Sequence, residues 1–167
     1  RGLLSSSINK KGRKIICLMS SFVKLNFKII FHLMGLLIMV NGGFMLLATF
    51  VSFYYKDGVE KEMLEAGLVT LLIGLILMLL TRNKRKELQK RDGYVIVTFG
   101  WIFMSLAGTL PYLFTDSIPS FTDAFFETMS GYTTTGASIL NDIEIIPKGV
   151  LFWRSITHWI GGMGIIV

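Results

Sequence analysis

Three long runs of uncharged, mostly apolar residues limit this chain to a small set of folds. They extend from Ile29 to Tyr55, from Ala66 to Thr81 and from Gly93 to Thr115. A helix needs about twenty apolar residues to cross a bilayer. The chain is also 52% hydrophobic, with a mean hydropathy of +0.61, which is too apolar for an ordinary soluble domain. We therefore predict an all-α integral membrane protein, in which Met63 and Leu64 extend the short second run.

Charged residues occur in blocks between these runs. Residues 1–28 contain only basic charges, residues 82–92 contain an excess of them, and residues 56–65 contain more acidic than basic residues. Lys and Arg flank the cytoplasmic ends of membrane spans, so we predict a cytoplasmic N-terminus and 82–92 loop and an external 56–65 loop. This pattern accounts for the net charge of +6 better than nucleic-acid binding does.

The stretch from Ser120 to Ser138 differs from its apolar surroundings. Its first part is predicted to be a short amphipathic helix, capped by Ser120 or Thr122 and ending at Gly131. Phe121, Phe125 and Phe126 would form an aromatic face that packs against the surrounding spans. A short helix of this kind between two spans is typical of a re-entrant pore loop.

An uncharged loop rich in hydroxyl groups, Tyr132 to Ser138, follows this helix. Irregular backbone is tolerated at membrane depth only where protein buries it or where it lines a water-filled cavity. Carbonyl-type ion filters use such backbone to replace the water shell of an ion. Gly136 can adopt a positive φ, and Thr and Ser support a loop without adding charge. We predict that this loop contributes main-chain oxygens to an ion filter.

The sequence around this loop resembles the first pore unit of the TrkH-type transporters in the Trk/Ktr/HKT superfamily. The likeness is specific from about Arg91 to Val167, and only the general layout is similar before that. The matching segments are Arg91–Gly93, Gly108–Tyr112, Ile118–Glu127, the loop itself, Pro147–Gly149, Phe152–Ser155 and Thr157–Gly164.

The resemblance implies an architecture. Residues 1–28 would be a basic cytoplasmic segment, and 29–92 would hold two leading transmembrane helices with a basic cytoplasmic loop. Residues 93–167 would form the first helix–pore-helix–filter–helix repeat, with its last helix truncated. In the family one chain supplies four non-identical loops to a filter, so this chain would carry one of the four. The remaining three repeats would lie in a longer protein.

The resemblance also implies a function, namely potassium uptake across the cell inner membrane. The main-chain carbonyls of Thr134, Thr135, Gly136 and Ala137 would bind K⁺, with Thr133 and Ser138 supporting them. K⁺ would be the transported ion, and no covalently bound cofactor is expected. The implied partners are the lipid bilayer, the remaining repeats, a second copy in a homodimer and a cytosolic nucleotide-binding regulatory ring.

Other classes of function fit less well. A phosphate-binding loop needs a Lys that this loop lacks, and nucleophilic catalysis by its Thr residues lacks a base, because the chain holds only His32 and His158. With Cys17 alone, no internal disulfide or Cys/His metal spacing exists. We therefore predict that the chain is not an enzyme. The alternative is a non-conducting membrane anchor or assembly subunit whose loop only packs.

We expect different roles for Glu127 and Arg154, two charged residues near the loop. Glu127 is expected to be a local hydrogen-bond partner or to neighbour a buried cation. Arg154 lies in the outer turn of a fourth apolar segment, Gly149 to Val167, which is expected to begin another span. A long basic side chain there can extend to the membrane interface. Glycines 161, 162 and 164 are expected to pack closely against the short helix.

Overall fold

The computed structural model of the chain describes residues 27–81, 90–140 and 142–166. Every regular element in these ranges is an α-helix. The helices are α2 (Phe27–Tyr55), α3 (Glu60–Leu80), α4 (Lys90–Gly108), α5 (Leu110–Phe114), α6 (Phe121–Tyr132) and α7 (Lys148–Ile166). The predicted basic segment at the N-terminus and most of the 82–92 loop lie outside the described residues.

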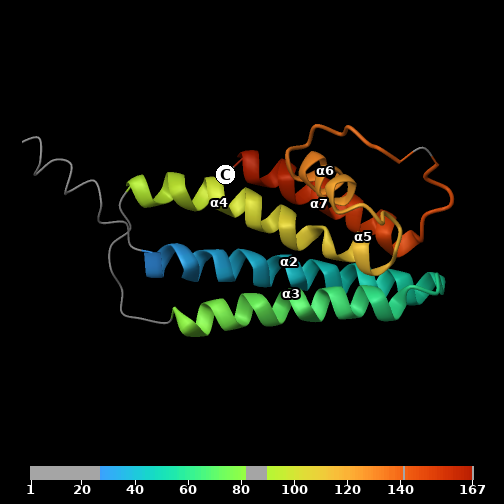
Figure 1. Cartoon of the computed structure of the whole chain (residues 1–167), viewed down its shortest axis with the longest axis horizontal. Coiled ribbons are helices and arrows are strands. Elements are labelled where there is room, and N and C mark those ends of the chain that lie inside the picture. Colours follow the sequence, from blue (N-terminus) through green and yellow to red (C-terminus); the bar gives the residue numbers. More distant parts are fainter. Residues whose placement is uncertain (1–26, 82–89, 141, 167) are drawn as a thin grey trace, which may run out of the picture.

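Helices α2 and α3 form a long antiparallel hairpin, and they run side by side in Figure 1. The turn between them contains two positive-φ residues, Lys56 and Gly58. Glycines bring the helix axes close together, as expected where membrane helices pack tightly. A Cβ on Gly74 would lie 2.7 Å from the main-chain nitrogen of Met39, and one on Gly35 would lie 2.9 Å from the Gly74 oxygen. The hairpin therefore has no room for larger side chains at these positions.

Three helical segments among the described residues are long and apolar enough to cross a membrane: Lys28–Tyr55, Glu60–Leu80 and Gly93–Phe114. They correspond to the three predicted runs. The second begins earlier than its uncharged run, because Glu60 and Glu62 occupy its first turn, where acidic side chains interact favourably with the helix dipole. The third is interrupted at Thr109, between α4 and α5, two residues before Pro111, which has no main-chain N–H to continue the hydrogen bonding of a helix.

Helices α5 and α7 pack on this hairpin at one end of the bundle. Figure 1 shows α6 and α7 together at this end, and α6 contacts both α4 and α7. A buried cluster that includes Met45, Met63, Tyr112 and Trp153 joins α2, α3, α5 and α7. The indole Nε1 of Trp153 donates a hydrogen bond to the Gly108 carbonyl at 3.1 Å. The break between α4 and α5 is thus fixed by a side chain of α7.

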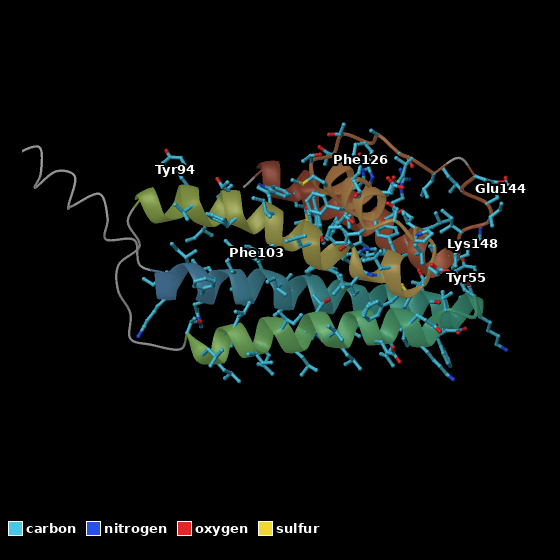
Figure 2. All side chains as sticks on the ribbon, in the orientation of Figure 1. Tyr55, Tyr94, Phe103, Phe126, Glu144 and Lys148 are labelled. Carbon is cyan, nitrogen blue, oxygen red and sulfur yellow. The ribbon has the colours of Figure 1, made fainter. Side chains whose placement is uncertain are left out.

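Figure 2 shows how the two ends of the bundle differ. Tyr55, Glu144 and Lys148 lie at one end, and Tyr94 lies at the other. The α2–α3 turn and the segment before α7 therefore share one end of the molecule, as the predicted topology requires.

Candidate functional site

The short helix α6 begins where the sequence predicts. Ser120 has extended backbone angles and accepts a hydrogen bond from the main-chain N–H of Asp123 at 3.5 Å, so it caps the helix. One face of α6 is buried and includes Ala124 and Glu127. The packing of the aromatic face against surrounding spans stays a prediction. Phe121 and Phe126 are 54% and 46% exposed, and Figure 2 shows Phe126 on the outer side of α6.

The C-terminus of α6 reverses the chain sharply. The main-chain N–H of Thr135 donates to the Ser130 carbonyl at 3.0 Å, and that of Thr134 donates to the Gly131 carbonyl at 2.9 Å. This pair of bonds is a Schellman motif, in which the residue after the cap adopts a left-handed conformation. That residue is Thr134, with φ of 56°. A β-branched residue in this conformation is strained, and such strain is concentrated at functional sites.

The helix therefore ends one residue later than predicted, at Tyr132, with Thr133 as its cap. Gly131 does not terminate it. A Cβ at Gly131 would collide with the Thr157 hydroxyl of α7, so this glycine permits close packing inside the last turn. The direction of the chain changes at Thr134 instead.

The segment Thr133–Ser138, which we name the threonine loop, follows this reversal and is exposed along its whole length. In a trans peptide the N–H and the preceding C=O point in opposite directions, and the described residues contain no cis bond. Because the N–H groups of Thr134 and Thr135 point back to α6, the carbonyls of Thr133 and Thr134 point away from it. No described residue donates a hydrogen bond to the carbonyls of Thr134, Thr135 or Gly136. The loop thus holds a short series of available oxygens.

Gly136 is the second left-handed residue of the loop, with φ of 74°. A Cβ on it would meet no atom within 4 Å, so the backbone conformation explains the glycine and steric crowding does not. Hydroxyl groups brace the loop on either side. Thr133 Oγ1 lies 2.8 Å from Thr135 Oγ1, and the Ser130 hydroxyl donates to the Ala137 carbonyl at 2.6 Å. Of the four carbonyls predicted to bind an ion, that of Ala137 therefore already accepts a hydrogen bond within the chain.

Glu127 anchors the far end of the loop. Its side chain is 1% exposed, and its Oε2 accepts hydrogen bonds from the Ser138 hydroxyl at 3.2 Å and from the main-chain N–H of Ile139 at 3.1 Å. Arg154 Nε of α7 donates to Oε1 at 2.6 Å and forms an ion pair with it. The expectation for Glu127 is confirmed. Ser138 therefore bonds through its hydroxyl to a buried carboxylate of α6.

The prediction that Arg154 extends to the membrane interface is wrong. Its side chain is 21% exposed and turns inward to Glu127, because an ion pair compensates a buried carboxylate that would otherwise be costly. Sequence spacing gave no sign of this pair, since the two residues lie in different helices.

Of the three glycines in the C-terminal half of α7, Gly161, Gly162 and Gly164, Gly161 makes the closest contact with α6. A Cβ on Gly161 would overlap the main-chain carbonyl of Tyr132, so α7 contacts the backbone of α6 directly at its last residue. Gly164 faces Trp101 of α4 instead, at 3.3 Å from its added Cβ. The predicted close packing is confirmed for Gly161.

Comparison with known proteins identifies relatives of this arrangement. A family model described as TrkH, cation transport protein, matches residues 59–167. The Trk system potassium uptake protein TrkH of Salmonella typhimurium is 40% identical over 144 residues, which cover 86% of this chain and 30% of that protein. An uncharacterized cation transporter of Methanocaldococcus jannaschii is 36% identical over 138 residues, which cover 83% and 29%.

A solved structure also matches. The crystal structure of the potassium transporter TrkH from Vibrio parahaemolyticus superimposes with a TM-score of 0.79 at 38% identity, covering 85% of this chain and 31% of that one. The chain thus spans about 30% of the length of the curated relatives it matches.

Proposed function

Because the chain belongs to the TrkH family of cation transport proteins, we propose that it supplies one of four filter loops of a potassium uptake protein. The main-chain oxygens of Thr134, Thr135 and Gly136 bind the dehydrated K⁺, and Ala137 contributes the remaining lone pair of its carbonyl. Thr133 and Ser138 support the loop. The other three loops come from repeats beyond the matched 30% of the relatives.

One observation carries this proposal: the loop offers consecutive carbonyls that no described residue uses. A carbonyl filter needs oxygens that are free to replace the hydration shell of an ion. The C-terminus of α6 meets the loop, and its partial negative charge favours a cation there.

We also propose a membrane location, an orientation and partners for the protein. The protein is a multi-pass protein of the cell inner membrane with a cytoplasmic N-terminus, so the end of the molecule that Tyr55 and Lys148 mark in Figure 2 is external. Its partners are a second copy, in a homodimer, and a cytosolic nucleotide-binding ring.

The test is Gly136→Ala in the full-length protein, reconstituted in lipid vesicles and measured for K⁺ and Na⁺ flux. Gly58→Ala is a matched control, because Gly58 also has a positive φ, of 82°, and open space around an added Cβ. Both substitutions impose similar backbone strain, of about 1 kcal/mol. We expect only Gly136→Ala to lower the preference for K⁺ over Na⁺.

Two results would contradict the proposal. One is an unchanged ion preference in Gly136→Ala at normal protein levels. The other is a full-length protein that conducts no cation at all, which would favour the non-conducting anchor.

A further inference from the structure

A buried asparagine in the leading hairpin is bonded to the helix that carries the threonine loop. Asn41 lies in the middle of α2 and is 0% exposed. Its Oδ1 accepts a hydrogen bond from the Tyr132 hydroxyl at 2.5 Å. Its Nδ2 donates to the Met104 carbonyl of α4 at 3.3 Å. Both ends of one amide group therefore bind other helices.

Burying the Asn41 amide in a membrane span costs free energy unless hydrogen bonds replace its hydration. A buried amide loses its hydration and is tolerated only when it is hydrogen-bonded, and an apolar residue would suit a membrane span better. The buried hydroxyls of Thr70 and Thr128 bond only within their own helices, to the carbonyls four residues before them. Asn41 instead connects α2 with α4 and α6.

Tyr132, the hydrogen-bond partner of Asn41, lies where α6 ends and the threonine loop begins. Tyr132 is the last residue of α6 and immediately precedes the cap residue Thr133. Its side chain is fixed by Asn41, while its main-chain carbonyl lies against Gly161 of α7. The orientation of the final turn of α6, and so the starting direction of the threonine loop, depends on these two contacts.

A second contact joins the leading hairpin to the other helix of the pore unit. The carboxylate of Asp57, in the α2–α3 turn, accepts a hydrogen bond from the main-chain N–H of Gly149 at 2.7 Å, in the first turn of α7. Ser52 of α2 packs against the same glycine, 2.5 Å from an added Cβ. The hairpin thus holds the start of α7 as well as the end of α6.

We propose that Asn41 is a positioning residue of the ion filter, which fixes the last turn of α6 through Tyr132 although it lies outside the pore unit. This inference rests on the proposed function of the threonine loop. When the bond is lost, the tyrosine and the last turn gain freedom, so the loop carbonyls are less well aligned. A misaligned filter distinguishes K⁺ from Na⁺ less well while it still conducts.

The experiment uses the full-length protein in vesicles, with Asn41→Leu, Tyr132→Phe and the double variant. Thr70→Val is the matched control, because it replaces an equally buried polar group whose bond stays within α3. Each single variant is expected to lower the ratio of K⁺ to Na⁺ flux by about 2- to 10-fold, the range that one buried hydrogen bond supplies. The double variant should be no worse than the worse single one, since both changes remove one shared bond.

Three outcomes separate the possibilities. A reduced ratio in both single variants without further loss in the double variant supports the proposal. An unchanged ratio in Tyr132→Phe, or effects that multiply in the double variant, overturns it. Tyr132→Phe removes only a hydroxyl, so it decides the question if Asn41→Leu does not fold. If Gly136→Ala lowers the ratio and the Asn41 pair does not, this inference fails while the filter assignment stands.

Discussion

Replacing Glu127 with glutamine is expected to disorganise the threonine loop more than any other change of similar size. Glutamine has the shape of glutamate but no charge. It would leave the Arg154 guanidinium, 21% exposed, facing a neutral group. It would also weaken the bonds from Ser138 and from the Ile139 N–H, which now reach a carboxylate.

The size of the effect follows from these contacts. Removing one partner of a buried ion pair costs about 3–5 kcal/mol, and each hydrogen bond to a charged group contributes roughly 1.5–3 kcal/mol. Because glutamine can still accept a hydrogen bond, we expect the lower end, about 3 kcal/mol. That corresponds to roughly a hundredfold shift between the ordered loop and disordered alternatives.

Two measurements on the full-length protein test this reasoning: thermal stability in detergent, and the ratio of K⁺ to Na⁺ flux in vesicles. Asp123→Asn is the control, because it makes the same chemical change one turn away on α6 at an exposed position. Glu127→Gln should lower both quantities. Asp123→Asn should leave the flux ratio unchanged and should lower stability by less than about 1 kcal/mol, because it loses only the interaction of a first-turn carboxylate with the helix dipole. Adding Arg154→Met should restore part of the stability, since it removes the uncompensated charge.

The reasoning would be refuted if Glu127→Gln and Asp123→Asn behaved alike. It would also be refuted if Arg154→Met made the Glu127→Gln protein still less stable. The unpaired charge of Arg154 would then not be the cause of the lost stability.

Two further substitutions test the packing around the loop. Ser130→Ala removes the hydroxyl that donates to the Ala137 carbonyl at 2.6 Å. It should lower the flux ratio of K⁺ to Na⁺ by no more than about tenfold, as expected for one hydrogen bond. An unchanged ratio would mean that this carbonyl needs no support from Ser130. Gly161→Ala places a methyl group on the Tyr132 carbonyl and should lower stability by about 1–3 kcal/mol in thermal unfolding. Gly43→Ala, where an added Cβ meets nothing within 4 Å, should not; equal losses would refute the close contact.

The sequence predicts the helices well because the lipid solvent leaves few alternatives. A run without charge such as Ile29–Tyr55 must become a helix if it crosses a bilayer, and α2 covers it. The start of α3 lies outside the uncharged run, because its first turn contains Glu60 and Glu62. Absence of charge therefore marks the lipid-facing part of a helix and not its first turn, where acidic side chains are favourable.

The loop was harder to predict than the helices around it. Gly131 has the residue type that commonly follows a helix C-terminus, yet it is inside α6 for a packing reason that only the position of Thr157 reveals. Thr134, which no conformational preference would select, takes the left-handed position instead. Gly136 was identified correctly as a residue that needs conformational freedom.

Contacts between distant residues could not be predicted from local patterns. Arg154 and Glu127 are 27 positions apart, and Asn41 and Tyr132 are 91 apart. A lone Asn in an apolar run was the only signal for the second pair, since a polar group in a membrane span marks a structural or functional partner. Naming that partner requires the fold.

The central claim is that main-chain oxygens around Gly136 contact the permeating ion. A structure of the full-length protein with Rb⁺ or Tl⁺ in place of K⁺, located by anomalous scattering, tests it most directly. We predict density within direct coordination distance of the carbonyls of Thr134, Thr135 and Gly136. Density on the ion pathway that these oxygens do not contact, or a threonine loop that faces lipid in the assembled protein, would contradict the account.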